Sequence, residues 1–172
     1  MHLTRFTDYS LRVLIFLAVK GEERSTINEI AERFEISRNH LMKVVQELSH
    51  KGYITAIRGK NGGLLLKKAP EEIRLGRLVR DTENDLELVE CFGDSNECRI
   101  TPACRLKPIL VEALRAFIAV LDKYTLADML GPQQPQLAQL LSIEPLKRDK
   151  DSNTPPRAAP GTLRERPGTA MT

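Results

Sequence analysis

Residues 26–53, TINEIAERFEISRNHLMKVVQELSHKGY, decide the fold of this 172-residue chain. Thr26, followed three residues later by Glu29, is the capping-box pattern of a helix N-terminus. Ser37 is placed to cap a second helix, which Lys51-Gly52 would end. Two apolar stripes at helical spacing lie between these signals: Ile27, Ile30, Ala31, Phe34, and then Leu41, Val44, Val45, Leu48. Two short amphipathic helices across a tight connection predict a helix-turn-helix.

A β-hairpin is predicted directly after the second helix. Residues 53–57 (YITAI) favour a strand, Gly59–Gly63 a turn, and Leu64–Leu66 a returning strand. A hairpin in this place is the wing of a winged helix. Apolar spacing predicts one more helix ahead of the helix-turn-helix, over residues 6–20. The expected fold class is therefore mainly α with a small β-wing.

The chain beyond the wing predicts further helices, the longest of which would serve as a dimerisation helix if the chain is the homodimer that the family resemblance described below implies. A short helix is expected over residues 70–79, then a helical or extended piece to about residue 90. A long amphipathic helix follows from residue 106 to 121, with Pro108 in its first turn, and a further turn over residues 124–130. Packed against a two-fold mate, the long helix would bury Leu110, Leu114, Phe117 and Leu121.

The expected organisation has three parts. Residues 1–70 form the winged helix-turn-helix DNA-binding region, and residues 71–130 hold the cysteine loop and dimerisation helix. Residues 131–172 hold seven of the ten prolines, which predicts a flexible tail in which only residues 137–143 favour a helix. No apolar run reaches the roughly 18 residues of a membrane span, and no cleavage motif follows the N-terminal apolar run, so we expect a cytoplasmic protein.

Charge is divided between two neighbouring segments. Residues 37–68 carry seven basic side chains and one acidic, whereas residues 69–104 carry nine acidic and four basic. This distribution indicates a polyanion-facing surface beside a separate control region, although two ordinary solvated faces would also explain it.

DNA contacts are predicted at the start of the second helix, because those residues of a helix-turn-helix reach base edges. They are Ser37, Arg38, Asn39 and His40. Arginine pairs with guanine and asparagine with adenine through two hydrogen bonds each. Ser37 suits a cap and a phosphate contact, and Lys43, one turn along, suits phosphate. His40 is placed for a phosphate contact, a base contact or simple exposure.

The wing supplies two further basic residues. Arg58 and Lys60 flank Gly59, and the glycines let the hairpin tip approach a groove or backbone closely. Each residue alone is equally an exposed polar side chain. Helix spacing, caps, wing and basic charge together predict DNA binding.

Cys91, Cys98 and Cys104 are the three cysteines of the chain, in the pattern Cys-x6-Cys-x5-Cys. An odd number of thiols cannot all pair internally, but three thiolates are most of a ligand set for a metal or an iron–sulfur cluster. The spacing is neither that of a zinc ribbon nor that of a ferredoxin. Zinc and three idle thiols remain alternatives.

Five stretches together carry a family resemblance: 3–14 (LTRFTDYSLRVL), 36–54 (ISRNHLMKVVQELSHKGYI), 58–66 (RGKNGGLLL), 98–107 (CRITPACRLK) and 124–130 (YTLADML). They resemble the Rrf2 family of winged-helix regulators, most of all its nitric-oxide-sensitive repressors, over residues 1–130. The resemblance implies a homodimer with one iron–sulfur cluster per subunit, 4Fe-4S favoured over 2Fe-2S. It also implies binding to an inverted-repeat operator and release when nitric oxide reacts with the cluster.

The same resemblance implies a fourth ligand, an aspartate from the first helix of the other subunit, here Asp8. An aspartate in a first helical turn also has a purely helical explanation, because the helix dipole favours it. Arg12 lies one turn later and is placed to orient the Asp8 carboxylate. Related cluster-assembly regulators use a histidine three residues after the last cysteine, where this chain has Lys107.

Two rival functions stay open. One is a regulator of the same kind that senses iron, redox state or cluster supply, and the other is a zinc-binding DNA or interaction protein. An enzyme is not expected, because the chain has no histidine-paired nucleophile, and Gly59–Gly63 lacks the lysine of a phosphate-binding loop.

Overall fold

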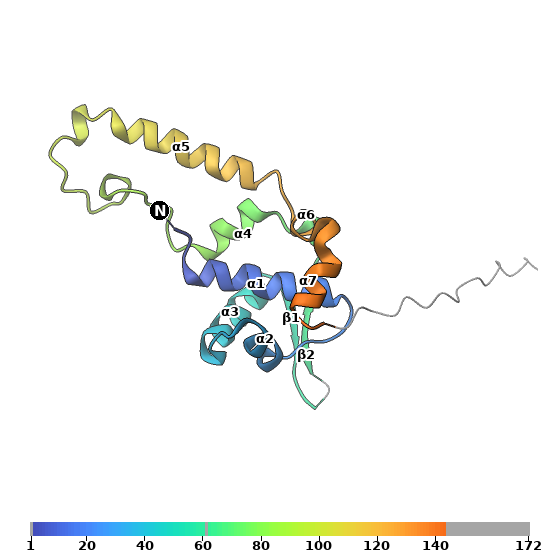
Figure 1. Cartoon of the computed structure of the whole chain (residues 1–172). Helices are drawn as coiled ribbons and strands as arrows, with labels where there is room; N and C mark the ends of the chain where they lie inside the picture. Colours follow the sequence, from blue (N-terminus) through green and yellow to red (C-terminus); the bar gives the residue numbers. More distant parts are fainter. Residues whose placement is uncertain (1, 61, 144–172) are drawn as a thin grey trace, which may run out of the picture.

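The computed structural model describes residues 2–60 and 62–143 of the chain. Three helices come first: α1 (Arg5–Lys20), α2 (Ile27–Phe34) and α3 (Arg38–His50). They confirm the predicted helix-turn-helix and the helix before it (Figure 1). The tight connection between α2 and α3 contains Glu35 in the left-handed conformation, with a φ of 53°.

The two predicted helix caps differ in outcome. The capping box of α2 is complete, because Thr26 Oγ1 accepts from the Glu29 amide at 3.1 Å and the Glu29 carboxylate accepts from the Thr26 amide at 3.4 Å. Ser37 occupies the N-cap position of α3, but its side chain makes no capping hydrogen bond. The prediction that the Ser37 side chain caps this helix is therefore wrong.

The predicted wing is present as an antiparallel hairpin. Strand β1 (Ile54–Ile57) pairs with β2 (Gly63–Leu66), so that Ile54 stands opposite Leu66 and Ile57 opposite Gly63. Leu64 also exchanges two backbone hydrogen bonds with Ser25, at 2.7 and 3.1 Å. These bonds hold the hairpin against the connection between α1 and α2.

The predicted helix over residues 70–79 is interrupted. A single 3₁₀ turn, η1 (Pro70–Glu72), is followed by a separate helix, α4 (Leu75–Thr82). The chain is extended between them because the Ile73 carbonyl accepts from the Leu126 amide at 2.9 Å. Residues 83–89 contain no helix or strand, so the helical form of the expected piece is absent, whereas the backbone is extended at both ends of the segment, at Glu83 and Val89.

Residues 84–121, called the arm from here on, leave the body of the protein and return to it (Figure 1). The outward part holds two 3₁₀ turns, η2 (Glu90–Phe92) and η3 (Thr101–Ala103). The returning part is α5 (Leu106–Leu121), with Pro108 in its first turn as predicted. No residue of α5 is buried, although the helix is rich in apolar side chains.

The chain from residue 131 onward differs from the expected tail. After α6 (Leu126–Leu130) come a 3₁₀ turn, η4 (Gly131–Gln133), and a short helix, α7 (Gln134–Leu140). Residues 131–143 are ordered because Ala138, Leu141 and Ile143 are buried in the same core as α1. The rest of the expected tail, residues 144–172, lies outside the described residues.

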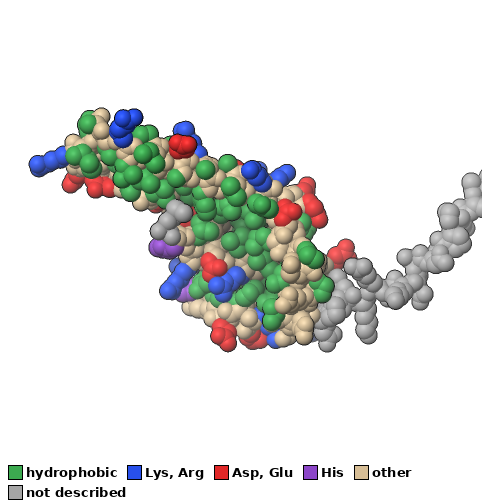
Figure 2. Space-filling view, turned by 45° about the horizontal axis from the view of Figure 1, so that its top comes forward, with side chains coloured by type: hydrophobic (Ala, Val, Ile, Leu, Met, Phe, Trp, Pro, Cys, Tyr) green, Lys and Arg blue, Asp and Glu red, His purple; other side chains and the backbone are tan. Residues whose placement is uncertain are grey.

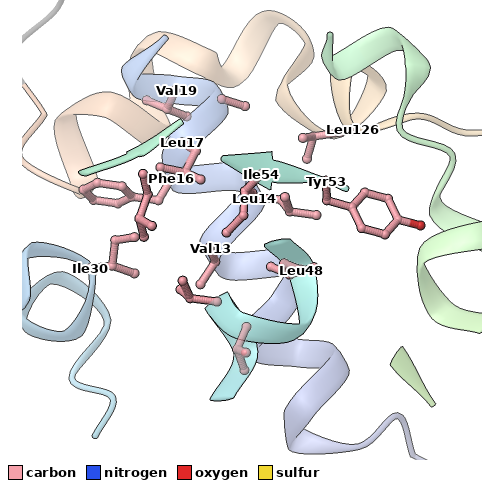
Figure 3. Packing of buried hydrophobic residues seen from close by; sticks show 14 of the residues in the cluster. Val13, Leu14, Phe16, Leu17, Val19, Ile30, Leu48, Tyr53, Ile54 and Leu126 are labelled. Atoms are coloured by element: carbon pink, nitrogen blue, oxygen red, sulfur yellow. The ribbon is translucent and has the colours of Figure 1, made fainter. Parts of the chain in front are cut away.

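The core is built around α1. Val13, Leu14, Phe16 and Leu17 are at most 1% exposed and pack with residues of α3, β1 and α6 (Figure 3). Burying each such side chain stabilises the fold by about 1.5–3 kcal/mol. The core therefore fixes the positions of the recognition helix and the wing. Among the described helices, none is long and apolar enough to cross a membrane.

Candidate nucleic-acid interface and metal centre

The predicted base-reading residues lie together on the outer face of α3. Ser37, Arg38, Asn39, His40 and Lys43 are all exposed. The opposite face of the helix is buried through Leu41, Val44, Val45 and Leu48. Because one face is committed to the core, the N-terminal turn of α3 is presented to solvent.

Glycines shape the wing tip that carries the two other predicted contacts. Arg58 and Lys60 are exposed beside Gly59, whose φ of 106° favours glycine. A Cβ on Gly62 would stand 2.2 Å from the carbonyl oxygen of Ile57, so no larger residue fits there. In Figure 1 the wing and α3 lie on the side of α1 opposite α5. The structure thus places both sets of basic residues away from the arm.

Asp8 lies in the first turn of α1 and is paired with Arg12. The Arg12 guanidinium approaches the Asp8 carboxylate at 2.8 Å and 3.1 Å. The Asp8 side chain is 45% exposed and that of Arg12 is 40% exposed. Arg12 also lies 5.9 Å from the ring centres of Tyr9 and Phe34. The Asp8 carboxylate is therefore oriented by its own helix while remaining open to solvent.

The three cysteines lie in the outer part of the arm. Cys91 belongs to η2, Cys98 to the following loop, and Cys104 to the end of η3, just before α5. All three thiols are free and half-buried. The loop is held around Cys98, whose amide donates to the Asn96 side chain at 3.1 Å and whose carbonyl accepts from the Thr101 hydroxyl at 2.8 Å.

The cysteines match a metal or iron–sulfur group in the chemistry of their donor atoms. Three free thiols on one loop are ligands that iron and zinc both prefer. Within residues 2–60 and 62–143, however, no three His, Cys, Asp or Glu side chains stand close enough together to hold a metal ion. Asp8 is on α1 and not in the loop. A single chain therefore supplies suitable donors without assembling them.

The sequence gives no local signal for the tertiary contacts of residues 80–83. Arg80, Asp81, Thr82 and Glu83 look like an ordinary polar helix end. In the structure each of the four makes a hydrogen bond to a different part of the chain. Only the tertiary fold brings their partners to them, because each partner lies far away in sequence.

Comparison with protein families identifies the chain over most of its length. Residues 3–132 match the family described as "Rrf2: Iron-dependent Transcriptional regulator". The chain is 53% identical over 144 residues to the HTH-type transcriptional regulator NsrR of Bacillus licheniformis, which covers 83% of this chain and 100% of the relative. It is 54% identical over 146 residues to the protein of the same name from Bacillus subtilis, covering 84% and 99%.

Solved structures of transcriptional regulators share the fold. CymR, the global cysteine regulator of B. subtilis, superimposes with a TM-score of 0.59 at 26% identity, covering 75% of this chain and 95% of CymR. IscR of T. potens gives a TM-score of 0.59 at 27% identity, covering 76% and 86%. The predicted winged-helix fold class is confirmed by these likenesses and by the two-stranded wing.

Proposed function

The chain belongs to the Rrf2 family of transcriptional regulators, and on that basis we propose that it is an iron–sulfur repressor that nitric oxide releases from DNA. A regulator of this family is not an enzyme. The observation that carries the proposal is the pairing, in one chain, of an exposed recognition helix with an arm that bears three free thiols. Its strong identity to regulators named NsrR supports the same function.

DNA binding rests on α3 and the wing. In the proposed complex, Arg38 and Asn39 contact base edges, while Ser37, His40 and Lys43 contact phosphates or the groove edge. Arg58 and Lys60 at the wing tip follow the neighbouring minor groove or backbone. The exposure of all these side chains supports the assignment.

The proposed homodimer uses α5. Leu106 is 55% exposed and Ile109 60%, and Figure 2 shows hydrophobic side chains along the arm. An apolar helix of this kind needs a partner to cover it. A second copy packed along α5 would cover Leu110, Leu114, Phe117 and Leu121, and would hold two recognition helices about one DNA turn, roughly 34–36 Å, apart.

The proposed cluster is held by Cys91, Cys98 and Cys104, with Asp8 contributed by the other subunit. Three thiols leave one iron of a 4Fe-4S cluster without a protein ligand, and the solvent-open carboxylate of Asp8 is suited to fill that place. Arg12 would orient Asp8. The cluster would then join the arm of one subunit to α1 of the other.

Release from DNA follows from that cross-subunit link. When bound, the cluster supplies iron sites that react with nitric oxide. Asp8 is a carboxylate among thiolates, so it would be the ligand that the cluster holds least tightly, and Arg12 would keep the released carboxylate in an ion pair. With α1 no longer held by the other subunit's arm, the two recognition helices lose the spacing that fits both half-sites. Operator affinity then falls.

Anaerobic purification followed by iron and sulfide analysis tests the proposal most directly. We expect a brown protein with iron and acid-labile sulfide, and loss of operator binding on titration with nitric oxide. A colourless zinc protein would favour the metal-binding alternative. Retained affinity for DNA after complete reaction of the cluster would exclude the proposed release.

A second candidate function is supported by the family description. Because the matching family is described as iron-dependent, a regulator that senses iron, redox state or cluster supply is the main alternative. It shares the DNA contacts and the thiols, and differs only in the signal. A response of the target promoter to iron chelation, with none to nitric oxide, would favour it.

A further inference from the structure

The arm is attached to the body along α4, and both of its ends meet the last turn of that helix. At its outward end, the chain leaves α4 through Glu83, whose carboxylate accepts from the Thr4 amide at 2.9 Å. At its returning end, Asp122 follows α5 and accepts two hydrogen bonds from Arg80, at 2.7 and 3.1 Å. Arg80 and Glu83 belong to the last turn of α4 and its C-cap. Both ends of the arm therefore pull on the same short segment.

The same turn contacts the base of the wing. The Tyr53 hydroxyl donates to the Asp81 carboxylate at 2.6 Å, although Tyr53 is only 2% exposed. Tyr53 precedes β1, and its carbonyl accepts from the Lys67 amide at 2.9 Å, just after β2. The Lys68 ammonium lies 5.2 Å from the centre of the Tyr53 ring. Asp81 thus holds the point where both strands of the hairpin begin and end.

Burial keeps this hydrogen bond in one state. Desolvation, with the neighbouring Asp81 carboxylate, raises the pKa of the Tyr53 hydroxyl well above its ordinary value. Tyr53 therefore remains protonated, and a hydrogen-bond donor, at neutral pH. The bond is a fixed mechanical contact between α4 and the wing.

The third residue of the turn contacts α1. The hydroxyls of Thr7 and Thr82 lie 2.9 Å apart, and both residues are buried. Thr7 is adjacent to Asp8, the proposed cluster ligand. Residues 80–83 accordingly join three structures: the end of α5, the wing base and the start of α1, where Thr82 and Glu83 both bind.

We propose that the Tyr53–Asp81 hydrogen bond transmits the position of the arm to the wing, so that Tyr53 and Asp81 are positioning residues for DNA binding. This inference rests on the proposed function, because it assumes that the state of the cysteine loop moves the arm. Movement of the arm shifts the last turn of α4 through Arg80 and Glu83. Asp81 then carries Tyr53, and with it the hairpin that bears Arg58 and Lys60.

The surroundings of the turn allow such a shift. A hollow of about 570 Å³ is lined by residues of this turn, of α3 and of the start of α1, among them Thr4, Lys43 and Asp81. In the proposed movement, this space would accommodate a displacement of the turn towards the recognition helix. The wing, in contrast, is attached directly through Asp81.

Tyr53→Phe in the full-length protein is the test, since it removes one hydroxyl and keeps the buried ring. The probe is a DNA duplex selected by the wild-type protein from a random-sequence pool. The affinity of the protein for this duplex is measured anaerobically in two forms, one reconstituted with iron and sulfide and one depleted of both. We expect the ratio of the two affinities to shrink by roughly tenfold in the variant, because a hydrogen bond to a charged group contributes on that order.

Hydrogen exchange of the wing amides gives a second readout that does not depend on DNA. In the wild type, exchange of the β1 and β2 amides should differ between the reconstituted and depleted forms. In Tyr53→Phe, the wing amides should exchange alike in both forms. A merely structural role for Tyr53 would raise exchange equally in both forms and leave their difference intact.

Two further variants complete the design. Asp81→Asn keeps a hydrogen-bond acceptor for Tyr53 and should retain part of the affinity ratio. Arg77→Met removes the 3.8 Å ion pair with Asp81 while keeping the Tyr53 contact, and should behave as the wild type. An unchanged ratio in Tyr53→Phe beside a large wild-type ratio would overturn this inference alone. A wild-type ratio near one would overturn the proposed function and the inference with it.

Discussion

Gly76 and Asp122 meet where α4 and α5 join, with no space for a methyl group between them. A Cβ on Gly76 would stand 2.2 Å from Oδ1 of Asp122 and 2.9 Å from its backbone nitrogen. The side chain of Asp122 can turn away, but its backbone cannot, because that amide donates to the Ile118 carbonyl at 2.9 Å. Gly76 thus sets how closely the arm approaches the body.

Gly76→Ala should displace the base of α5. Forcing a methyl group into this contact costs about 1–3 kcal/mol in free energy of unfolding, despite the better helix propensity of alanine. Urea denaturation measures this cost. Asp122→Ala, which removes the side chain and leaves the backbone contact, is the matched comparison. A Gly76→Ala protein as stable as the wild type would contradict the close packing.

Arg12→Met should change the cluster without removing it. The Asp8 carboxylate would lose its 2.8 Å partner, and so its orientation, while the three thiols remain. We expect an altered visible spectrum and altered sensitivity to nitric oxide, with iron content near that of the wild type. Because both side chains are substantially exposed, stability should change by less than about 1 kcal/mol. Asp8→Ala should reproduce the spectral change, and identical spectra for both variants and the wild type would exclude Asp8 as a ligand.

Arg38→Ala and Lys43→Ala should weaken DNA binding in different ways. Loss of a base contact at Arg38 should cost about 1–3 kcal/mol and relax the preference at one base pair. Loss of a phosphate contact at Lys43 should weaken binding to all sequences and reduce the salt slope by about one. Lys123→Ala, just after the arm, is the control and should bind as the wild type. If both variants relaxed the same base preference, the division of roles would be wrong.

Acid should loosen the region where the arm meets α6. Arg80 holds the pKa of Asp122 below its ordinary value of 3.8, and the backbone and hydroxyl of Thr125 do the same for Asp128. The stabilisation by these carboxylates is complete above that ordinary value and is lost as pH falls through the lower folded-state pKa. The melting temperature of Asp122→Asn, Asp128→Asn should therefore depend less on pH below about 4 than that of the wild type. Asp122 is partly exposed and Asp128 is exposed, so added salt should reduce the difference.

Local signals in the sequence were sufficient to predict the helix-turn-helix and the wing. Thr26 and Glu29 form their capping box, and the hairpin turns at its glycines, because both depend on neighbours a few residues away. Ser37 shows the limit of such signals, since its position at the helix start was right and its side-chain hydrogen bond is absent. A cap position and a cap bond are separate properties.

Contacts between distant segments account for what the sequence did not predict. The break before α4 arises because Ile73 accepts from Leu126, a partner 53 positions away that no local pattern indicates. Burial of Ala138 against the core, within a proline-rich stretch, has the same origin. The thiols were found from spacing alone, but within the described residues of one chain they are not assembled with other ligands, and the fourth ligand that we propose belongs to a second chain.

The arm begins and ends at the same turn of α4. Residues 84–121 can therefore be regarded as a segment inserted into the body of the protein. The body closes on itself through Arg80 and Asp122, so the excursion can change length with little penalty, because the entropy of closing a loop grows only slowly with its length. Exchange of residues 84–105 for a loop of different chemistry would leave both the DNA-binding half and the proposed dimerisation helix α5 in place. A fold built in this way would let the sensing loop change while the DNA-binding scaffold stays the same.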